Sequence, residues 1–140
     1  MFQAVIDTNV LVAAMRSNRG ASFRMLKQVG SPLWRLHLSV ALALEYEAVL
    51  KRNCDVFGLS EDDVDDFVSF LCSQAGLQWI YFQWRPAAAD PDDDLVLEAA
   101  IASRSDFVVT FNKRDFAGCE RFGIRCMTPQ EFLILVEEPR

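Results

Sequence analysis

The stretch "FQAVIDTNVLVAAM" (residues 2–15) changes character at a single acid. Its first part, "FQAVI" (2–6), is rich in strand-forming residues and ends at Asp7, and residues 9–16 follow with the pattern of a helix. A strand that leads directly into a helix is typical of an α/β domain with a parallel sheet, in which ligands bind beyond the carboxyl ends of the strands. We therefore expect Asp7 to lie at the edge of the sheet where chemistry takes place.

The rest of the chain repeats this alternation of short apolar strands and helical stretches. We expect further strands over 33–39, 77–82, 106–110 and 123–127, and further helices over 21–29, 40–52, 60–75, 93–104 and from 128 onward. The pattern predicts an α/β fold with a central parallel sheet of 4–5 strands. The length of 140 residues is usual for one domain, so we expect residues 1–140 to form a single domain.

Composition restricts the class of protein. With 51% hydrophobic residues the chain can bury one core, and no apolar run reaches the roughly 18 residues of a membrane helix. The start lacks the features of a signal peptide, so we expect a cytoplasmic protein with no membrane partner. The four cysteines form no CxxC pair and the one histidine, His37, is distant from them, so the spacing argues against zinc and for reduced thiols.

Charge is distributed unevenly along the chain. The net charge of −6 argues against a passive nucleic-acid binder, yet residues 1–44 carry five basic residues and one acid, Asp7. Residues 45–66 hold eight acids and two bases. Two interpretations of the basic region stay open: it faces phosphates, or its arginines are ordinary charges on helix surfaces.

Glu45 interrupts an apolar stripe in the predicted helix 40–52. On helical spacing the stripe comprises Ala41, Leu42, Ala48 and Val49, and Glu45 lies in its middle. A buried carboxylate is normally neutralised, paired or bound to a metal. The alternative is a slightly rotated helix with Glu45 at the edge of the stripe, and periodicity alone favours it slightly.

Four aspartates fall within five positions of "DPDDDLVLEAA" (90–100). Helical spacing places Asp94 on one face with Leu97 and Ile101, so Asp94 is expected to point along the core-facing stripe at the start of the helix. Asp92 and its neighbour can act as N-cap or first-turn acids, which the positive end of the helix stabilises by about 0.3–1 kcal/mol each.

A fourth acid follows the predicted strand 106–110. In "TFNKRDF" (110–116), Asp115 is the nearest carboxylate and Asn112 is a neutral oxygen donor, although a surface loop would look similar. Two carboxylates about 4 Å apart repel by about 4 kcal/mol at an effective dielectric constant of 20, so acids that converge need a cation. Oxygen ligands without Cys or His suit Mg²⁺ or Mn²⁺, which can activate water and clamp a phosphate during an in-line displacement.

Taken in order, four features resemble the PIN domain family over roughly residues 2–135. They are "VIDTNVL" (5–11), the inward Glu45, "DDDLVLEAA" (92–100) and "VVTFNKRDF" (108–116). The resemblance implies a three-layer α/β/α fold and a Mg²⁺- or Mn²⁺-dependent endoribonuclease. Small bacterial members resemble VapC-type toxins of toxin–antitoxin pairs, so it also implies an RNA substrate, a cognate antitoxin and a homodimer.

The resemblance also implies roles for individual residues. The catalytic acids and metal ligands would be Asp7, Glu45, Asp94 and Asp115. The residues expected to orient them are Thr8, Asn9, Ser39 and Asn112, although helix capping explains the first three equally well. Asn112 stands in a slot that is often acidic. The basic residues expected near RNA phosphates are Arg16, Arg19, Lys113 and Arg114.

Other functions remain in competition. A non-catalytic PIN-like module that binds RNA or protein would suit the acidic net charge and Asn112. An aspartyl-phosphate receiver or phosphatase fits poorly, because "IDTN" offers one acid and position 9 is Asn. His37 is expected to be structural. The aromatic residues of the strand regions are expected in the core or a dimer interface rather than against bases; they are Trp34, Trp79, Tyr81, Phe82 and Trp84.

Overall fold

The computed structural model describes residues 1–78 and 91–138, with the backbone alone described over 91–94. Its centre is a five-stranded sheet in the order β3-β2-β1-β4-β5, and every strand pair is parallel. The strands are β1 (Phe2–Ile6), β2 (Trp34–Ser39), β3 (Gly76–Gln78), β4 (Phe107–Val109) and β5 (Arg125–Met127). The predicted α/β fold with a parallel sheet of 4–5 strands is confirmed.

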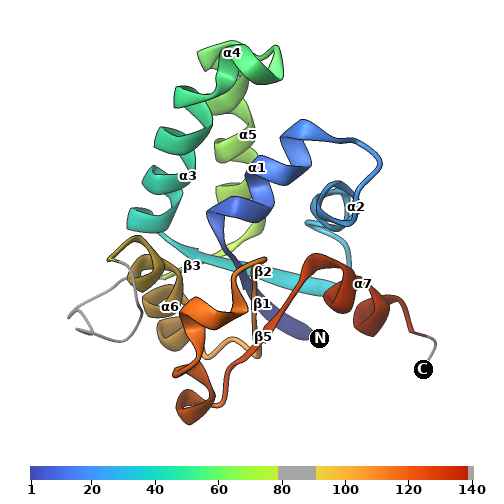
Figure 1. Cartoon of the computed structure of the whole chain (residues 1–140), viewed down its shortest axis with the longest axis vertical. Coiled ribbons are helices and arrows are strands. Elements are labelled where there is room, and N and C mark those ends of the chain that lie inside the picture. Colours follow the sequence, from blue (N-terminus) through green and yellow to red (C-terminus); the bar gives the residue numbers. More distant parts are fainter. Residues whose placement is uncertain (79–90, 139–140) are drawn as a thin grey trace.

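The order of the strands decides which face each helix covers. Helices α1 (Thr8–Arg16) and α2 (Ala21–Lys27) connect β1 to β2, and helices α3 (Val40–Arg52), α4 (Cys54–Phe57) and α5 (Glu61–Gln74) connect β2 to β3. The next crossover, helix α6 (Pro91–Ser103), returns in the opposite direction to β4. Since parallel crossovers are right-handed, α6 covers the face opposite to α1, α3 and α5, which gives three layers (Figure 1).

The C-terminal part of the chain closes the sheet at β5. Two short 3₁₀ helices, η1 (Lys113–Phe116) and η2 (Cys119–Phe122), connect β4 to β5, and α7 (Pro129–Glu137) follows. Helix α7 packs on α2, and its Phe132 ring meets Trp34 edge-on at 5.2 Å and Phe107 at 5.8 Å between centroids. Trp34 is thus a core residue, as expected, whereas the other four strand aromatics lie outside the described residues.

Helix boundaries follow the capping residues of the sequence. Ser60 and Asp63 form a capping box at the start of α5, and Thr128 and Glu131 form one at the start of α7. Gly30 ends the α2 region with a positive φ of 89°. Among residues 1–78 and 91–138, none of the helices combines the length and the apolar character needed to cross a bilayer.

Two details of the sequence interpretation were wrong. The third strand was predicted from residue 77, but β3 begins at Gly76, which has no room for a side chain because a Cβ would collide with the His37 ring of the neighbouring strand. The predicted third strand therefore starts earlier, and its residues 79–82 lie outside the described residues. The buried stripe of α3 consists of Leu42, Ala43, Tyr46 and Leu50, so Ala41 and Ala48 face solvent and Glu45 is half-buried beside the stripe.

Candidate active site

Asp7 lies between the ends of β1 and β4, the two adjacent strands at the centre of the sheet. Its backbone amide donates to the Val109 carbonyl at 2.9 Å, which extends the pairing of the two strands by one residue. Its side chain is 7% exposed, and its Oδ2 accepts a hydrogen bond of 2.7 Å from the Thr110 hydroxyl. Asp7 directly precedes α1, so its carboxylate is held by Thr110 and lies close to the amides at the start of that helix.

Burial governs the protonation of this carboxylate. Loss of solvent raises the pKa of Asp7 above its ordinary value, and the negative charge of Asp115 adds to the rise. Hydrogen bonds from Thr110 and from the amides of Thr8 and Asn9 lower the pKa in part. The Asp7 carboxylate is therefore held in a fixed position without a basic partner among the described side chains, which is a state that a cation would relieve.

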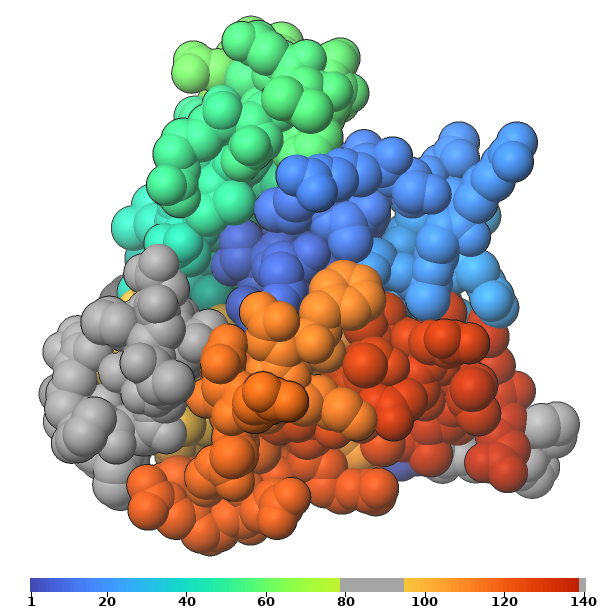
Figure 2. All heavy atoms as spheres, in the orientation of Figure 1, coloured from blue at the N-terminus to red at the C-terminus, as the bar shows by residue number. Residues whose placement is uncertain are grey.

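Asp115 and Asn112 belong to the segment that follows β4. The Thr110 hydroxyl accepts a hydrogen bond of 3.0 Å from the Asn112 amide, so one hydroxyl links the Asp7 side chain to the start of η1. The Asp115 amide donates in turn to the Asn112 carbonyl at 3.0 Å. In Figure 2 this segment, coloured orange, lies directly against the dark blue start of α1. Asp7, Asn112 and Asp115 are thus brought to one edge.

Glu45 lies on α3 next to Tyr46, a residue that contacts the end of β1. The Tyr46 hydroxyl, which is fully buried, donates to the carbonyl of Ile6, the residue immediately before Asp7. Burial raises the pKa of Tyr46 well above its ordinary value, so the phenol stays protonated and keeps this bond. The bond fixes the second turn of α3, and with it the half-buried Glu45, beside the end of β1.

Asp94 is placed by its helix. In a parallel sheet the crossover helices run antiparallel to the strands, so α1, α3 and α6 all begin at the carboxyl ends of the strands. Asp94 lies in the first turn of α6, which contacts β1, α3 and η1. Helix α6 begins at Pro91, so Asp92 and Asp93 lie within its first turn rather than before it. The backbone therefore brings the start of α6 to the edge where Asp7 lies.

The residues expected to orient the acids occupy different positions. The Ser39 hydroxyl accepts a hydrogen bond of 3.0 Å from the Leu42 amide and caps α3. Its role in the structure is therefore helix capping, the alternative stated for it from the sequence. Thr8 is the first residue of α1 and is half-buried. The Asn9 Oδ1 is buried and has no hydrogen-bonding partner among the described residues. A buried oxygen without a hydrogen-bonding partner, two residues from Asp7, is a second indication that this edge could bind a cation.

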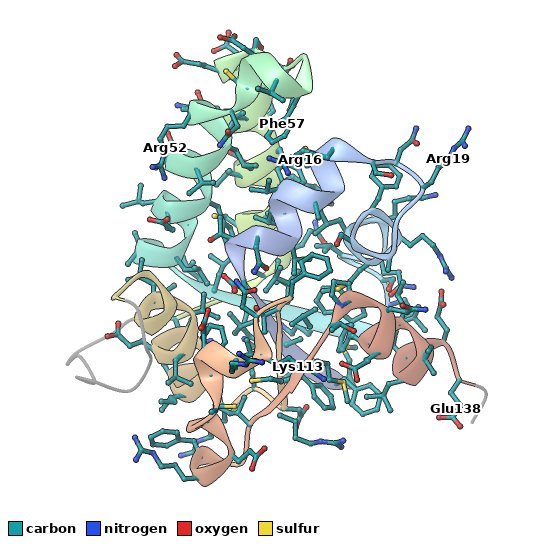
Figure 3. All side chains as sticks on the ribbon, in the orientation of Figure 1. Arg16, Arg19, Arg52, Phe57, Lys113 and Glu138 are labelled. Atoms are coloured by element: carbon teal, nitrogen blue, oxygen red, sulfur yellow. The ribbon has the colours of Figure 1, made fainter. Side chains whose placement is uncertain are left out.

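The basic residues do not gather around the acids. Arg16 lies at the last position of α1, and nine residues of helix put it about 12 Å from the start. Arg19 is exposed beyond the end of that helix, and Figure 3 shows both arginines far from Lys113. Lys113 is paired with Glu131 at 3.0 Å, while Arg114 is exposed next to Asp115. Within this set only Lys113 and Arg114 accompany the candidate acids.

The donor set suits an oxygen-binding divalent ion. The side chains at this edge offer carboxylate, hydroxyl and amide oxygens, which Mg²⁺ and Mn²⁺ prefer. Within the described side chains no group of three or more His, Cys, Asp and Glu residues lies close enough to hold a metal, and the Asp94 side chain is not among them. The buried Asp7 and the orphaned Asn9 oxygen nevertheless fit such an ion.

Two polar residues near the site were missed in the sequence. Thr110, which is fully buried, opens the stretch "TFNKRDF", and a polar residue at the end of an apolar strand was the available signal. Glu98 is 4% exposed on α6, four positions after Asp94 in the sequence. Residues 96–100 are all buried, so the local pattern gave no signal that marked Glu98.

Comparison with known proteins agrees with this geometry. The family model described as "PIN domain" matches residues 3–114, so the chain belongs to the PIN domain family. This confirms the resemblance found in the sequence. No curated protein matches the chain.

Solved structures show the same fold. The crystal structure of VapBC2 from Rickettsia felis, bound to a DNA fragment from their promoter, matches with a TM-score of 0.63 and 13% identity over 89% of this chain and 98% of that chain. VapBC-1 from nontypeable Haemophilus influenzae matches with a TM-score of 0.60 and 15% identity over 92% and 99%. At these identities the likeness concerns the fold.

Proposed function

We propose that the chain is a Mg²⁺- or Mn²⁺-dependent endoribonuclease that hydrolyses RNA phosphodiester bonds, with residues 1–140 forming one nuclease domain. The proposal rests on the Asp7 carboxylate, which is buried and accepts a hydrogen bond from Thr110. Burial and the charge of Asp115 raise the pKa of this carboxylate. Membership of the PIN domain family supports the same function.

In this proposal the acids bind the ion, and one of them also accepts a proton. Asp7, Glu45, Asp94 and Asp115 would hold the divalent ion, and Asn9 would add a neutral oxygen. When bound, the ion supplies positive charge that stabilises the phosphate during displacement by water. Thr110 keeps one oxygen of Asp7 in a fixed direction. Asp115 is only partly buried, which suits it to take up the proton of the attacking water.

We further propose that the protein is the toxin of a toxin–antitoxin pair and forms a homodimer. Support comes from the fold shared with the two VapBC structures. Growth arrest on expression, relieved by Asp7→Asn and by co-expression of a small protein encoded next to it, would be the expected result. Sedimentation of the purified chain as a monomer would contradict the homodimer.

RNA cleavage tests the enzymatic proposal. Purified protein should cut single-stranded RNA when Mg²⁺ or Mn²⁺ is added and should stop when EDTA removes the ion. Asp7→Asn should abolish cutting, whereas the matched substitution Asp62→Asn, on the exposed face of α5, should leave the rate unchanged. Metal-dependent cutting that survives in Asp7→Asn would overturn the assignment.

The alternative is a non-catalytic PIN-like module that binds RNA or protein. It predicts a folded protein that neither cuts RNA nor releases heat when Mn²⁺ is titrated into it. The same cleavage experiment, followed by calorimetry, therefore separates the two proposals.

A further inference from the structure

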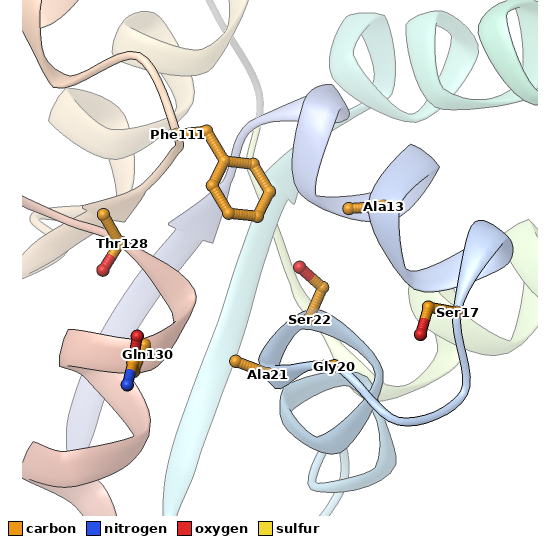
Figure 4. A pocket seen from close by; sticks show the side chains of 8 residues that line it. All are labelled: Ala13, Ser17, Gly20, Ala21, Ser22, Phe111, Thr128 and Gln130. Atoms are coloured by element: carbon orange, nitrogen blue, oxygen red, sulfur yellow. The ribbon is translucent and has the colours of Figure 1, made fainter.

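A hollow of about 430 Å³ opens at the carboxyl edge of the sheet, between α1, α2 and the start of α7 (Figure 4). Its volume falls within the range of about 300–1,000 Å³ that is usual for small-ligand sites. Phe111 is one of its walls and directly follows Thr110, the residue that holds Asp7. A wall of the hollow and the residue that holds Asp7 are therefore successive in the chain.

The ring of Phe111 is exposed in a way that is unusual for a phenylalanine. It keeps 49% of its surface accessible, and Figure 4 shows the ring pointing into the space between α1 and α2. An accessible aromatic face at a protein edge is a stacking platform for an unpaired base, and such stacking tolerates any base because every base has a π-face.

The polar groups of the hollow are available to a ligand. Ser22 is 4% exposed, and its hydroxyl points toward the Phe111 ring (Figure 4). Among the described residues, neither the Ser22 hydroxyl nor the exposed Gln130 amide has a hydrogen-bonding partner. The Ser22 oxygen is not sealed from solvent, so a bound hydrogen-bonding group could replace water at it.

A basic residue lies next to the hollow in the chain. Arg19 lies between Ser17 and Gly20, both of which line the hollow, and its side chain is exposed. The hollow thus offers an aromatic ring and two polar side chains, with a cation nearby in the chain. This combination suits a nucleotide whose base enters the hollow and whose phosphates run along the rim.

We propose that this hollow binds one unpaired nucleobase of single-stranded RNA, stacked on Phe111 and hydrogen-bonded to Ser22 and Gln130. The inference rests on the proposed function, since it places a base of the RNA substrate beside the acids. It assigns to Phe111 the affinity for bases and to Arg19 an affinity for phosphates that does not depend on the base.

Binding measurements test the assignment without relying on cleavage. Fluorescence anisotropy would follow a labelled single-stranded RNA 10-mer of mixed sequence and an abasic ribose-phosphate 10-mer of the same length, in EDTA. All proteins would carry Asp7→Asn so that no RNA is cut. The unsubstituted hollow should bind the mixed sequence about tenfold more tightly than the abasic chain.

Substitutions then separate stacking from other effects. Phe111→Ala and Phe111→Leu should remove the preference for bases, and Phe111→Tyr should keep it, because leucine is apolar without being aromatic. Ser22→Ala should weaken the preference in part. Arg19→Ala should weaken both ligands equally.

Several outcomes would overturn the assignment. One is a mixed-sequence affinity that Phe111→Ala leaves unchanged, and another is equal binding of the two ligands or no binding of either. A third is a change in sedimentation with Phe111→Ala at constant RNA affinity, which would mean that a protein partner occupies the hollow. A protein that binds RNA through Phe111 yet never cuts it would contradict only the ribonuclease proposal.

Discussion

The carboxylate of Asp7 lowers the stability of the metal-free protein. Its folded-state pKa is raised by burial, so the folded state holds the proton more tightly than the unfolded state does. The free energy of unfolding therefore falls as the pH rises from the ordinary carboxyl pKa of about 3.9 through the higher folded-state pKa. The penalty is present in full only above the folded-state pKa.

Replacing Asp7 by the neutral, nearly isosteric Asn should therefore stabilise the metal-free protein. We expect Asp7→Asn in EDTA at pH 7 to gain about 1 kcal/mol, which is a rise of roughly 3–5 °C in the melting midpoint for a domain of this size. Differential scanning calorimetry measures this. The gain should shrink as the pH is lowered toward 4. A variant that melts below the original protein at pH 7 would show that burial of the Asp7 charge does not lower the stability.

Thr110 should act through Asp7. Thr110→Val keeps the shape of the side chain but removes the donor, so the pKa of Asp7 should rise and the oxygen should lose its fixed direction. We expect Mn²⁺ affinity to fall by about 10- to 100-fold, as for other residues that orient metal ligands, and the acid limb of the cleavage rate to move to higher pH. Thr110→Ser should restore both. Unchanged affinity in the valine variant would show that the hydroxyl is only structural.

At the scale of elements, the site is a consequence of topology. Helices α1 and α3 begin within two residues of the ends of β1 and β2, and α6 runs antiparallel to the strands as they do, so the starts of all three helices lie toward the edge that the residues after β4 occupy. The positive ends of these helices also face the acids and favour their charged forms. Segments far apart in the chain are therefore brought to one edge without any local sequence signal that links them.

The first turn of α6 offers a matched pair of substitutions. Asp94→Asn should abolish RNA cleavage, because Asp94 is the acid that shares a helix face with Leu97 and Glu98. Asp92→Asn should leave the cleavage rate intact and cost about 0.3–1 kcal/mol of stability, since it removes a first-turn charge. Equal losses of activity in both variants would mean that the cluster acts only through its total charge.

The capping box of α5 gives a test of stability remote from the site. The Ser60 hydroxyl accepts a hydrogen bond of 3.0 Å from the Asp63 amide, and the Asp63 side chain accepts one of 2.9 Å from the Ser60 amide. Ser60→Ala should lower the free energy of unfolding by about 1 kcal/mol in urea titrations and leave the RNA cleavage rate unchanged below the melting midpoint. A larger loss of activity than of stability would connect α5 to the site.

The sequence predicted the positions of helices and strands better than the directions in which their side chains point. Strands and helices were predicted because caps such as Ser60 and Thr128 act locally, and Asp7 was placed because it follows an apolar strand. The stripe of α3 was misjudged because a helix packed on two neighbours is turned by its contacts, here Tyr46 with the Ile6 carbonyl. Thr110 and Glu98 were missed because their partners and their burial depend on tertiary contacts.

At the scale of the whole molecule, an acidic chain with a net charge of −6 carries a proposed RNA-cleaving site. The acids at the carboxyl edge add to that repulsion of RNA, so RNA would approach over exposed basic residues such as Arg19 and Arg114. A bound divalent ion would reduce the negative charge at the edge where the phosphate must arrive. The central claim is therefore that this edge binds a divalent ion through Asp7.

The most direct test of this claim is the melting midpoint of the purified protein as Mn²⁺ is added. An ion that binds only the folded state at 100 times its dissociation constant stabilises that state by about 2.7 kcal/mol, so the midpoint should rise and saturate. Asp7→Asn should start higher in EDTA and show no rise, whereas Asp62→Asn should behave as the original protein. A midpoint that Mn²⁺ does not move, or one that moves equally in Asp7→Asn, would contradict the account.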